Sequence, residues 1–167
     1  MINPHGSSEL NPLFVADDAL RAQLIAEAES LPSVVVSSAA AANAVMLGGG
    51  YFNPLTGYMN AADTLSVATD LKTSNGLFWP VPIVNLLPAI EGFSAGEKIA
   101  LRDPNVNGNP VIAIMNVDAI ETLSDDQIAL IIDNIYGTSD DAHPGVAAFK
   151  AQGNQLVSGP IQVLNFS

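Results

Sequence analysis

The segment 103–108, Asp-Pro-Asn-Val-Asn-Gly, carries oxygen-bearing side chains at the spacing with which a calcium-binding loop begins. Such a loop completes its oxygen cage with a bidentate glutamate at the twelfth position, where this sequence has Ile114. The flanking residues predict strands instead of the helices that enclose such a loop, and Asp, Asn and Gly are ordinary residues of tight turns. We therefore interpret 103–108 as a turn and expect it to bind no calcium.

Three consecutive glycines, Gly48 to Gly50, raise the question of a phosphate-binding loop. The pattern Gly-Lys-Ser/Thr does not follow them, and Asn53 stands where the dinucleotide-binding pattern G-x-G-x-x-G needs its third glycine. A helix that ends in glycine and passes into a turn accounts for the same residues. We therefore expect a helix end there and no phosphate site.

The chain has two histidines, His5 and His143. His143 follows Asp140 and Asp141, so a Ser-His-Asp arrangement can be drawn, but neighbours in sequence do not define catalytic geometry. Pro144 follows directly and favours a structural turn. A metal site with two histidines would require the two ends of the chain to meet. We expect neither arrangement.

Two pairs of adjacent carboxylates, Asp17-Asp18 and Asp125-Asp126, are the remaining candidates for a catalytic role. Both pairs lie at predicted helix starts, where the helix dipole stabilises negative charge without any catalytic role. The chain contains no cysteine, which excludes disulfides, thiolate metal sites and thiol nucleophiles. We therefore expect no catalytic, cofactor-binding or metal-binding residue in this chain.

The composition indicates one globular domain with an acidic surface. A length of 167 residues fits a single core, and 49% hydrophobic against 13% charged residues excludes a disordered chain. Five Lys and Arg against 17 Asp and Glu give a net charge of −12, which repels nucleic acid and acidic membranes. No apolar run approaches the roughly 18–20 residues of a membrane span, and the N-terminus lacks the pattern of a secretory signal. We expect a cytoplasmic protein without a nucleic-acid or membrane partner.

The first half of the chain predicts three helices and a short strand. Asp17 and Asp18 mark the first helix start, residues 33–37 a strand, and an alanine-rich helix then runs to Leu47. Asn60 can cap the third helix. The apolar faces of the first and third helices are predicted to be Leu20, Leu24, Ala28 and Leu31, and Ala61, Leu65, Ala68 and Leu71.

The second half predicts mainly strands. Residues 77–84 read as an edge or bent strand because they contain two prolines. Residues 98–102 and 111–117 flank a turn and predict a hairpin. We expect the strands from 77 to 117 to form an antiparallel, barrel-like sheet.

The remaining elements are a helix, a loop and a final strand. Ser124 and Gln127 form a capping box that begins a helix. Residues 137–144 predict a polar loop and 155–166 a last strand. The apolar stripe of the capped helix is Ile128, Ile131, Ile132 and Ile135. Helices mixed with antiparallel strands indicate an α+β domain.

Four segments of the sequence match sequence motifs of one enzyme family. Residues 43–59 contain a glycine-rich turn before F-[SN]-P-L-x-G-[FY]-M, and the others match G-x-x-[WF]-P-[VI]-P-[IL], I-A-L-R-D and Y-G-T-x-D-x-x-H-P-G-V. These other segments are, in order, 76–83, 99–103 and 136–146. In this order the four motifs resemble the N-terminal part of the ATP sulfurylases (sulfate adenylyltransferases), in the form found in bacteria.

The resemblance implies a PUA-like pseudo-β-barrel of mixed and antiparallel strands with surrounding helices. In that family this domain supports a nucleotidyltransferase domain, which joins sulfate to ATP, with magnesium on the nucleotide, and releases pyrophosphate. The family's catalytic motifs Q-x-R-N-P, H-x-x-H and G-R-D do not occur here, because Arg102-Asp103 follows leucine and neither histidine has a partner three residues away.

The resemblance further implies that residues 1–167 form a single N-terminal domain, without catalytic activity of its own and without a cofactor. Its expected partner is the catalytic domain of the same polypeptide, which this chain does not contain, and the parent enzyme can be a homo-oligomer. The apolar ending at 163–167 is typical of a cut near a domain junction. A free-standing PUA-like module that binds another protein remains the alternative.

Overall fold

The computed structural model describes residues 2–166, which form five helices and seven strands. Ser167, the last residue of the expected apolar ending, lies outside the described residues. Within them no helix has the length and apolar character needed to cross a membrane. In chain order the elements are α1 (Asp18–Ala28), β1 (Ser33–Val35), α2 (Ser38–Gly48), β2 (Gly57–Tyr58), α3 (Ala61–Asp70), β3 (Leu86–Leu87), β4 (Lys98–Arg102), β5 (Val111–Asn116), β6 (Ala119–Thr122), α4 (Asp125–Tyr136), α5 (Pro144–Lys150) and β7 (Gln155–Val163).

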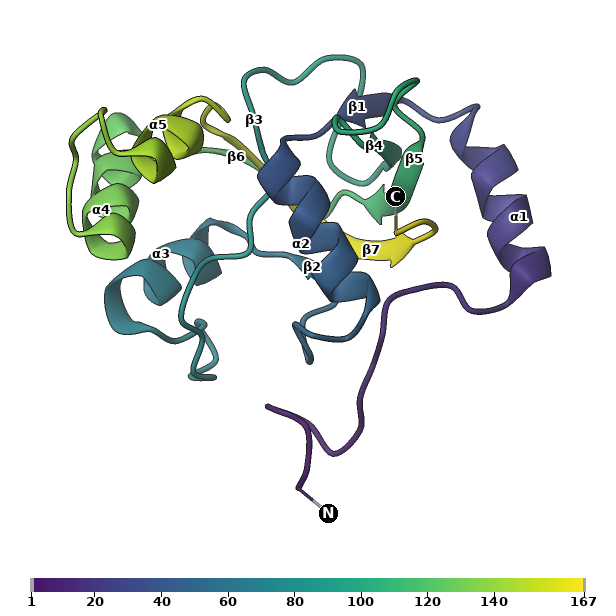
Figure 1. Cartoon of the computed structure of the whole chain (residues 1–167), viewed down its shortest axis with the longest axis horizontal. Coiled ribbons are helices and arrows are strands. Elements are labelled where there is room, and N and C mark those ends of the chain that lie inside the picture. The colour runs from purple at the N-terminus through teal and green to yellow at the C-terminus, as the bar shows by residue number, and fades with distance from the viewer. Residues whose placement is uncertain (1, 167) are drawn as a thin grey trace.

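The strands form one mixed sheet organised around β7, the last strand in sequence. The main path is β1-β4-β5-β7-β2, with β1 parallel to β4 and the other pairs antiparallel. The first half of β7 also pairs with β3 and β6. Helix α2 crosses one face of the sheet, α1 lies at one side, and α3, α4 and α5 gather at the other (Figure 1). The α+β class predicted from the sequence is confirmed.

A glycine allows β7 to exchange neighbours halfway along its length. Gly159 has a φ of 146°, and a Cβ at this position would lie 2.0 Å from the carbonyl oxygen of Asn116. On the same side of β7, residues before Gly159 pair with β6 and residues after it pair with β5. Only glycine tolerates this φ and this close approach of two backbones.

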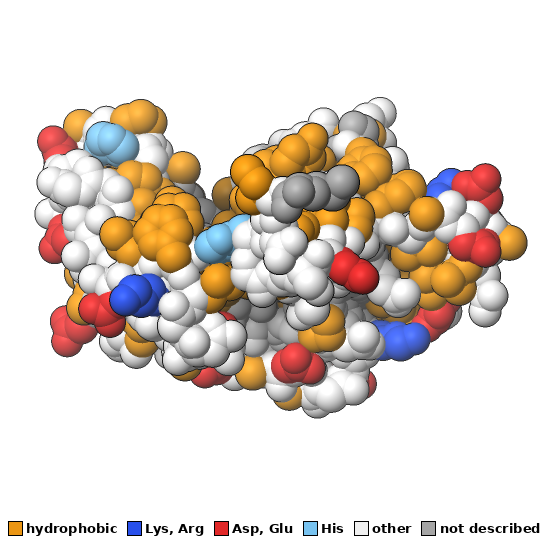
Figure 2. Space-filling view, turned by 90° about the horizontal axis from the view of Figure 1, so that it is seen from below, with side chains coloured by type: hydrophobic (Ala, Val, Ile, Leu, Met, Phe, Trp, Pro, Cys, Tyr) orange, Lys and Arg blue, Asp and Glu red, His pale blue; other side chains and the backbone are white. Residues whose placement is uncertain are grey.

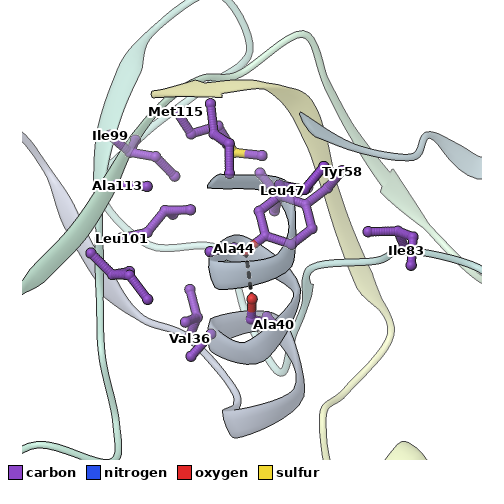
Figure 3. Packing of buried hydrophobic residues seen from close by; sticks show 14 of the residues in the cluster. Val36, Ala40, Ala44, Leu47, Tyr58, Ile83, Ile99, Leu101, Ala113 and Met115 are labelled. Carbon is purple, nitrogen blue, oxygen red and sulfur yellow. Dashed lines mark hydrogen bonds between the residues drawn. The ribbon is translucent and has the colours of Figure 1, made fainter. Parts of the chain in front are cut away.

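The main core lies between α2 and the sheet (Figure 3). Ala40 and Ala44 are fully buried on α2, and such small side chains let the helix lie close to the strands. Leu47 on α2 and Leu101 on β4 fill the space between them. The Tyr58 hydroxyl enters this core and donates a 2.7 Å hydrogen bond to the carbonyl oxygen of Ala40. Burial raises the pKa of Tyr58 far above its usual value.

We expect the change Tyr58→Phe to lower the free energy of unfolding by about 1 kcal/mol near pH 7, because one buried hydrogen bond is lost. Above pH ~10 the tyrosine of the unfolded chain ionises while Tyr58 in the folded protein stays neutral, so the wild type loses stability there. The phenylalanine variant lacks this loss. The difference in the free energy of unfolding between wild type and variant should therefore shrink by about 1.4 kcal/mol per pH unit above pH ~10. Urea denaturation at pH 8 and pH 11 measures both effects, and a difference independent of pH would contradict the assignment.

A second core lies among α3, α4 and α5. The capping box predicted at Ser124 is present: the Ser124 hydroxyl accepts from the Gln127 amide at 3.2 Å, and the Gln127 side chain accepts from the Ser124 amide at 2.9 Å. Ile131 and Ile132 are fully buried, and Ile128 and Ile135 pack against them. The predicted isoleucine stripe is therefore confirmed.

Several predicted elements are wrong in detail. Residues 77–84 form no strand, because Pro80 and Pro82 lack the amide protons that a ladder needs, and only Phe78 makes an isolated bridge, with Lys72. Within 77–117 the strands are thus limited to the β4–β5 hairpin and the short β3, which pairs with β7; β6 follows just after this range.

Two predicted helix faces are also corrected. Leu20 on α1 is exposed, while Leu24 and Ala28 are buried as expected. Leu71 is exposed because its φ of 55° ends α3, so it does not continue the apolar face. The helix α5 and the strands β2 and β6 were not predicted at all.

Candidate functional site

An apolar groove of about 620 Å³ opens on the face shown in Figure 2, where hydrophobic side chains gather on either side of a hollow that contains a histidine. We call it the aromatic groove. Its walls come from the N-terminal segment, from α2, from the loop after α2 and from the irregular stretch after α3. It is lined by His5, Ala39, Asn43, Tyr51, Phe52, Asn53, Phe78, Trp79, Pro80, Val81, Pro82, Ile83, Val84 and Gln152.

The proline-containing stretch 78–84 forms one wall because its two ends are tied to the domain. The Trp79 amide donates to the Leu71 carbonyl at 2.8 Å, and the Met59 amide donates to the Ile83 carbonyl at 2.8 Å. Between these ties the prolines prevent the stretch from joining the sheet. The wall is therefore extended, fixed at both ends, and open to the groove between them.

The N-terminal segment is held against the same wall by Asn53. Its buried side-chain amide donates to the His5 carbonyl at 3.0 Å and to the Ser7 hydroxyl at 2.7 Å, and its oxygen accepts from the Asn11 amide at 2.9 Å. A ring nitrogen of His5 lies 2.8 Å from the Phe78 carbonyl oxygen. These four contacts fix the position of the N-terminal segment at the groove.

The floor of the groove is built on Trp79, which is buried. Its ring lies 5.9 Å from the ring of Phe52 in an edge-to-face arrangement and 5.9 Å from the ring of His5. Two other aromatic residues of the lining remain exposed: Tyr51 by 76% and Phe78 by 54%. Exposed aromatic groups grouped around a hollow are typical of binding surfaces.

The lining of the aromatic groove is mainly apolar and neutral. Its lining contains no Asp, Glu, Lys or Arg, although the chain has 17 acidic residues. His5 is the one lining residue of the type that most often takes part in acid–base chemistry. The absence of catalytic residues from this chain remains a prediction.

The segment 103–108 is a turn, as the sequence predicts. The Asp103 carboxylate is buried and accepts from the Asn105 amide at 2.8 Å, while the Asn105 side chain accepts from the Ser38 hydroxyl at 2.7 Å. Ile114, at the position of the missing glutamate, is buried in β5. Over residues 2–166 no three His, Cys, Asp or Glu side chains are grouped so that they could hold a metal ion.

We expect calorimetric titration with calcium to give no binding at micromolar concentration. One carboxylate oxygen of Asp103 and the side-chain oxygen of Asn105 already accept hydrogen bonds, so a cation would compete with these bonds. The missing bidentate ligand removes the largest single contribution to such a site. Micromolar binding that is lost in Asp103→Ala would contradict this prediction.

The other residues weighed from the sequence have structural positions. A ring nitrogen of His143 accepts from the Gly145 amide at 3.2 Å as the N-cap of α5, and its ring lies 5.5 Å from that of Tyr136. His5 lies in the groove with a ring nitrogen near the Phe78 carbonyl oxygen, in a different part of the domain from α5. The structure therefore brings together neither a two-histidine site nor a triad.

The glycines end α2, as predicted, and the first of them is required by packing. A Cβ on Gly48 would lie 2.9 Å from the Cγ1 of Val163 and 2.9 Å from the ring of Phe166. The carboxylate pairs follow or form helix caps: Asp17 caps α1, and Asp125 and Asp126 lie in the first turn of α4. None of these groups lines the aromatic groove.

Sequence reasoning did not identify the groove, because its residues come from separate parts of the chain. The residue types nonetheless indicated which segments contribute to the groove, although not that they meet. Two of the four family-like motifs, 43–59 and 76–83, contain most of the lining, and both combine aromatic residues with proline.

Comparison with known proteins gives consistent matches. The sulfate adenylyltransferases of Alcanivorax borkumensis and Allochromatium vinosum are 58% and 57% identical over all 167 residues, and that of the Riftia pachyptila sulfur-oxidizing endosymbiont is 49% identical. The chain spans 42% of the length of the first two and 38% of the third. The resemblance drawn from the four motifs is confirmed.

Comparison of structures and of family patterns concerns the fold. A hexameric APS kinase from Thiobacillus denitrificans superposes with a TM-score of 0.70 at 23% identity, covering 99% of this chain and 27% of that one. This likeness shows a shared fold. The pattern of the PUA-like domain matches residues 2–166. The predicted pseudo-barrel fold is thus confirmed, and the chain belongs to the family of PUA-like domains.

Proposed function

We propose that this chain is the N-terminal, non-catalytic domain of a sulfate adenylyltransferase and acts as scaffold for a catalytic domain in the same polypeptide. The observation that carries the proposal is 58% identity to a sulfate adenylyltransferase over the whole chain, which spans only 42% of that enzyme. In the proposed parent reaction a sulfate oxygen attacks the α-phosphorus of magnesium-bound ATP. The bond from that phosphorus to the bridging oxygen breaks, and pyrophosphate leaves. Because the proposed reaction consumes ATP, we also propose that the protein works in the cytoplasm.

The distribution of positive charge supports a non-catalytic role. Stabilising a transferring phosphoryl group takes several convergent cations or N–H donors. Of the five cations, four are engaged in ion pairs and Lys72 makes none within residues 2–166. The pairs are Arg21–Asp18, Lys98–Glu27 at 3.0 Å, Arg102–Glu29 at 3.3 Å and Lys150–Asp141 at 2.6 Å.

The test is an assay of the complete polypeptide encoded by the gene. We expect sulfate-dependent release of pyrophosphate from ATP and magnesium, together with a catalytic domain that continues beyond Ser167. Absence of that release in a folded, full-length protein would contradict the proposal.

A free-standing module that binds another protein is the second candidate, and the aromatic groove favours it. The two candidates differ in one simple observation. A reading frame that stops at Ser167 leaves no catalytic domain in the same polypeptide, and the groove would then serve a separate protein.

A further inference from the structure

We infer that the aromatic groove is the docking site for an uncharged, apolar segment of the catalytic domain that follows in the same polypeptide. The inference rests on the proposed function and deepens it, because it assigns the surface through which the scaffold holds its partner.

Three large apolar side chains that are exposed to solvent share the groove. Tyr51, Phe78 and Val81 are exposed by 76%, 54% and 46% and lie in one lining. Burying apolar surface contributes about 25 cal/mol per Å². A segment that covers these three side chains would therefore gain more than one that binds isolated apolar residues elsewhere on the surface.

The charge of the lining determines which partners fit. The chain has 17 acidic residues and a net charge of −12, yet no acidic residue lines the groove. An apolar segment can enter without removing a charge from water, a step that is costly unless the charge is paired. Two copies of this chain would bring two net charges of −12 together, which disfavours a homodimer through this face.

The polar groups of the groove suit a polypeptide better than a charged metabolite. The side-chain amide of Asn43 has no hydrogen-bond partner among residues 2–166. The side-chain oxygen of Gln152 accepts from the Ser37 hydroxyl at 2.9 Å. The Gln152 amide nitrogen and both ends of the Asn43 amide therefore remain available. Neutral donors and acceptors of this kind match backbone groups of an extended segment, whereas the lining has no Lys or Arg to balance the charge of an anion.

The groove is already formed before anything binds. Asn53 ties the N-terminal segment to the loop after α2, and Trp79 and Ile83 take part in the hydrogen bonds that hold the proline-containing wall. A site that does not have to order itself on binding loses less conformational entropy. This rigidity is what a permanent scaffold surface requires.

The described chain ends near the groove. The Phe166 ring stacks on Phe14 with 4.4 Å between ring centres and lies against Gly48 at the end of α2. Tyr51 follows Gly48 by three residues, a distance of at most about 11 Å. More than half of the Alcanivorax relative lies outside the part that this chain matches, which is ample for a further domain.

The test measures access to the groove in the complete polypeptide through single cysteines, since residues 1–167 contain none. Val81→Cys and Tyr51→Cys report on the groove, and Leu20→Cys on α1 is the matched control, because Leu20 is exposed by 43% and Val81 by 46%. Each variant is labelled with a maleimide, and mass spectrometry of peptides locates the label. We expect the two groove cysteines to react at least tenfold more slowly than the control.

Each alternative occupant gives a different result. Equal labelling rates at all three positions would overturn the inference. Protection that disappears on hundredfold dilution would indicate a second copy, and protection that disappears on gel filtration would indicate a bound small molecule; either result would also overturn it. Sulfate-dependent pyrophosphate release by the unmodified polypeptide is measured separately. Activity with an accessible groove contradicts this inference alone, and protection without activity contradicts the proposed function alone.

Discussion

The change Ile131→Asp should lower the free energy of unfolding by about 4 kcal/mol or more. Ile131 is fully buried in the core formed by α3, α4 and α5, and no cation belongs to that cluster. A carboxylate there either stays charged without a partner or takes up a proton, and it leaves the space of the isoleucine side chain poorly filled. Urea denaturation followed by circular dichroism measures the loss.

A matched control lies on the same helix. Leu130 precedes Ile131 and is exposed by 38%, so Leu130→Asp introduces the same charge into α4 without burying it. We expect that control to change the free energy of unfolding by less than about 1 kcal/mol. If the Ile131 variant melted within a degree or two of the wild type, the packing of α4 described above would be wrong.

Residues 1–167 alone should release pyrophosphate from ATP and sulfate at less than a thousandth of the rate of the complete polypeptide. Each donor of a preorganised anion site contributes roughly 3–4 kcal/mol to the rate, and no converging set of cations exists in the described part of this chain. The net charge of −12 also repels both ATP and sulfate. The loss of activity is therefore expected to be complete within the range of the assay.

The comparison requires that the short chain is folded under assay conditions, which circular dichroism and a cooperative denaturation curve establish. A coupled enzymatic assay for pyrophosphate then compares the two proteins at equal molar concentration. Turnover by residues 1–167 above that thousandth would show that this domain contains catalytic groups, and it would refute the proposed division of labour.

Local signals in the sequence were reliable where one side chain decides the outcome. The caps at Asp17, Asn60 and Ser124 each accept a hydrogen bond from the amide three residues on, as their residue types predict. The hairpin of β4 and β5 was also predicted, because the residues that form its turn are adjacent in sequence. Such features depend on short stretches and can be read from them.

Features that depend on distant contacts were not predictable. On α3 the periodicity correctly placed Ala68 in the core shared with α4, but it missed Val67, which is buried because α3 also contributes to the main core. The two-residue strand β2 exists only through its pairing with β7, about a hundred residues later.

The groove lies beyond prediction from the sequence for the same reason. His5 approaches Phe78 across 73 residues, and Gln152 reaches Ser37 across 115 residues. No pattern within a short window could have placed these segments together. What the sequence does contain is a set of aromatic residues beside prolines, and only the fold shows that they share one hollow.

The central position of β7 has a consequence for the order of events during synthesis. A ribosome makes this strand last among the elements described, yet β2, β3, β5 and β6 all pair with it. Until β7 emerges, these four strands have exposed edges, which are prone to wrong pairing. The sheet therefore cannot form until its last strand has been made. A ribosome paused just before residue 155 would present an aggregation-prone intermediate to cellular chaperones.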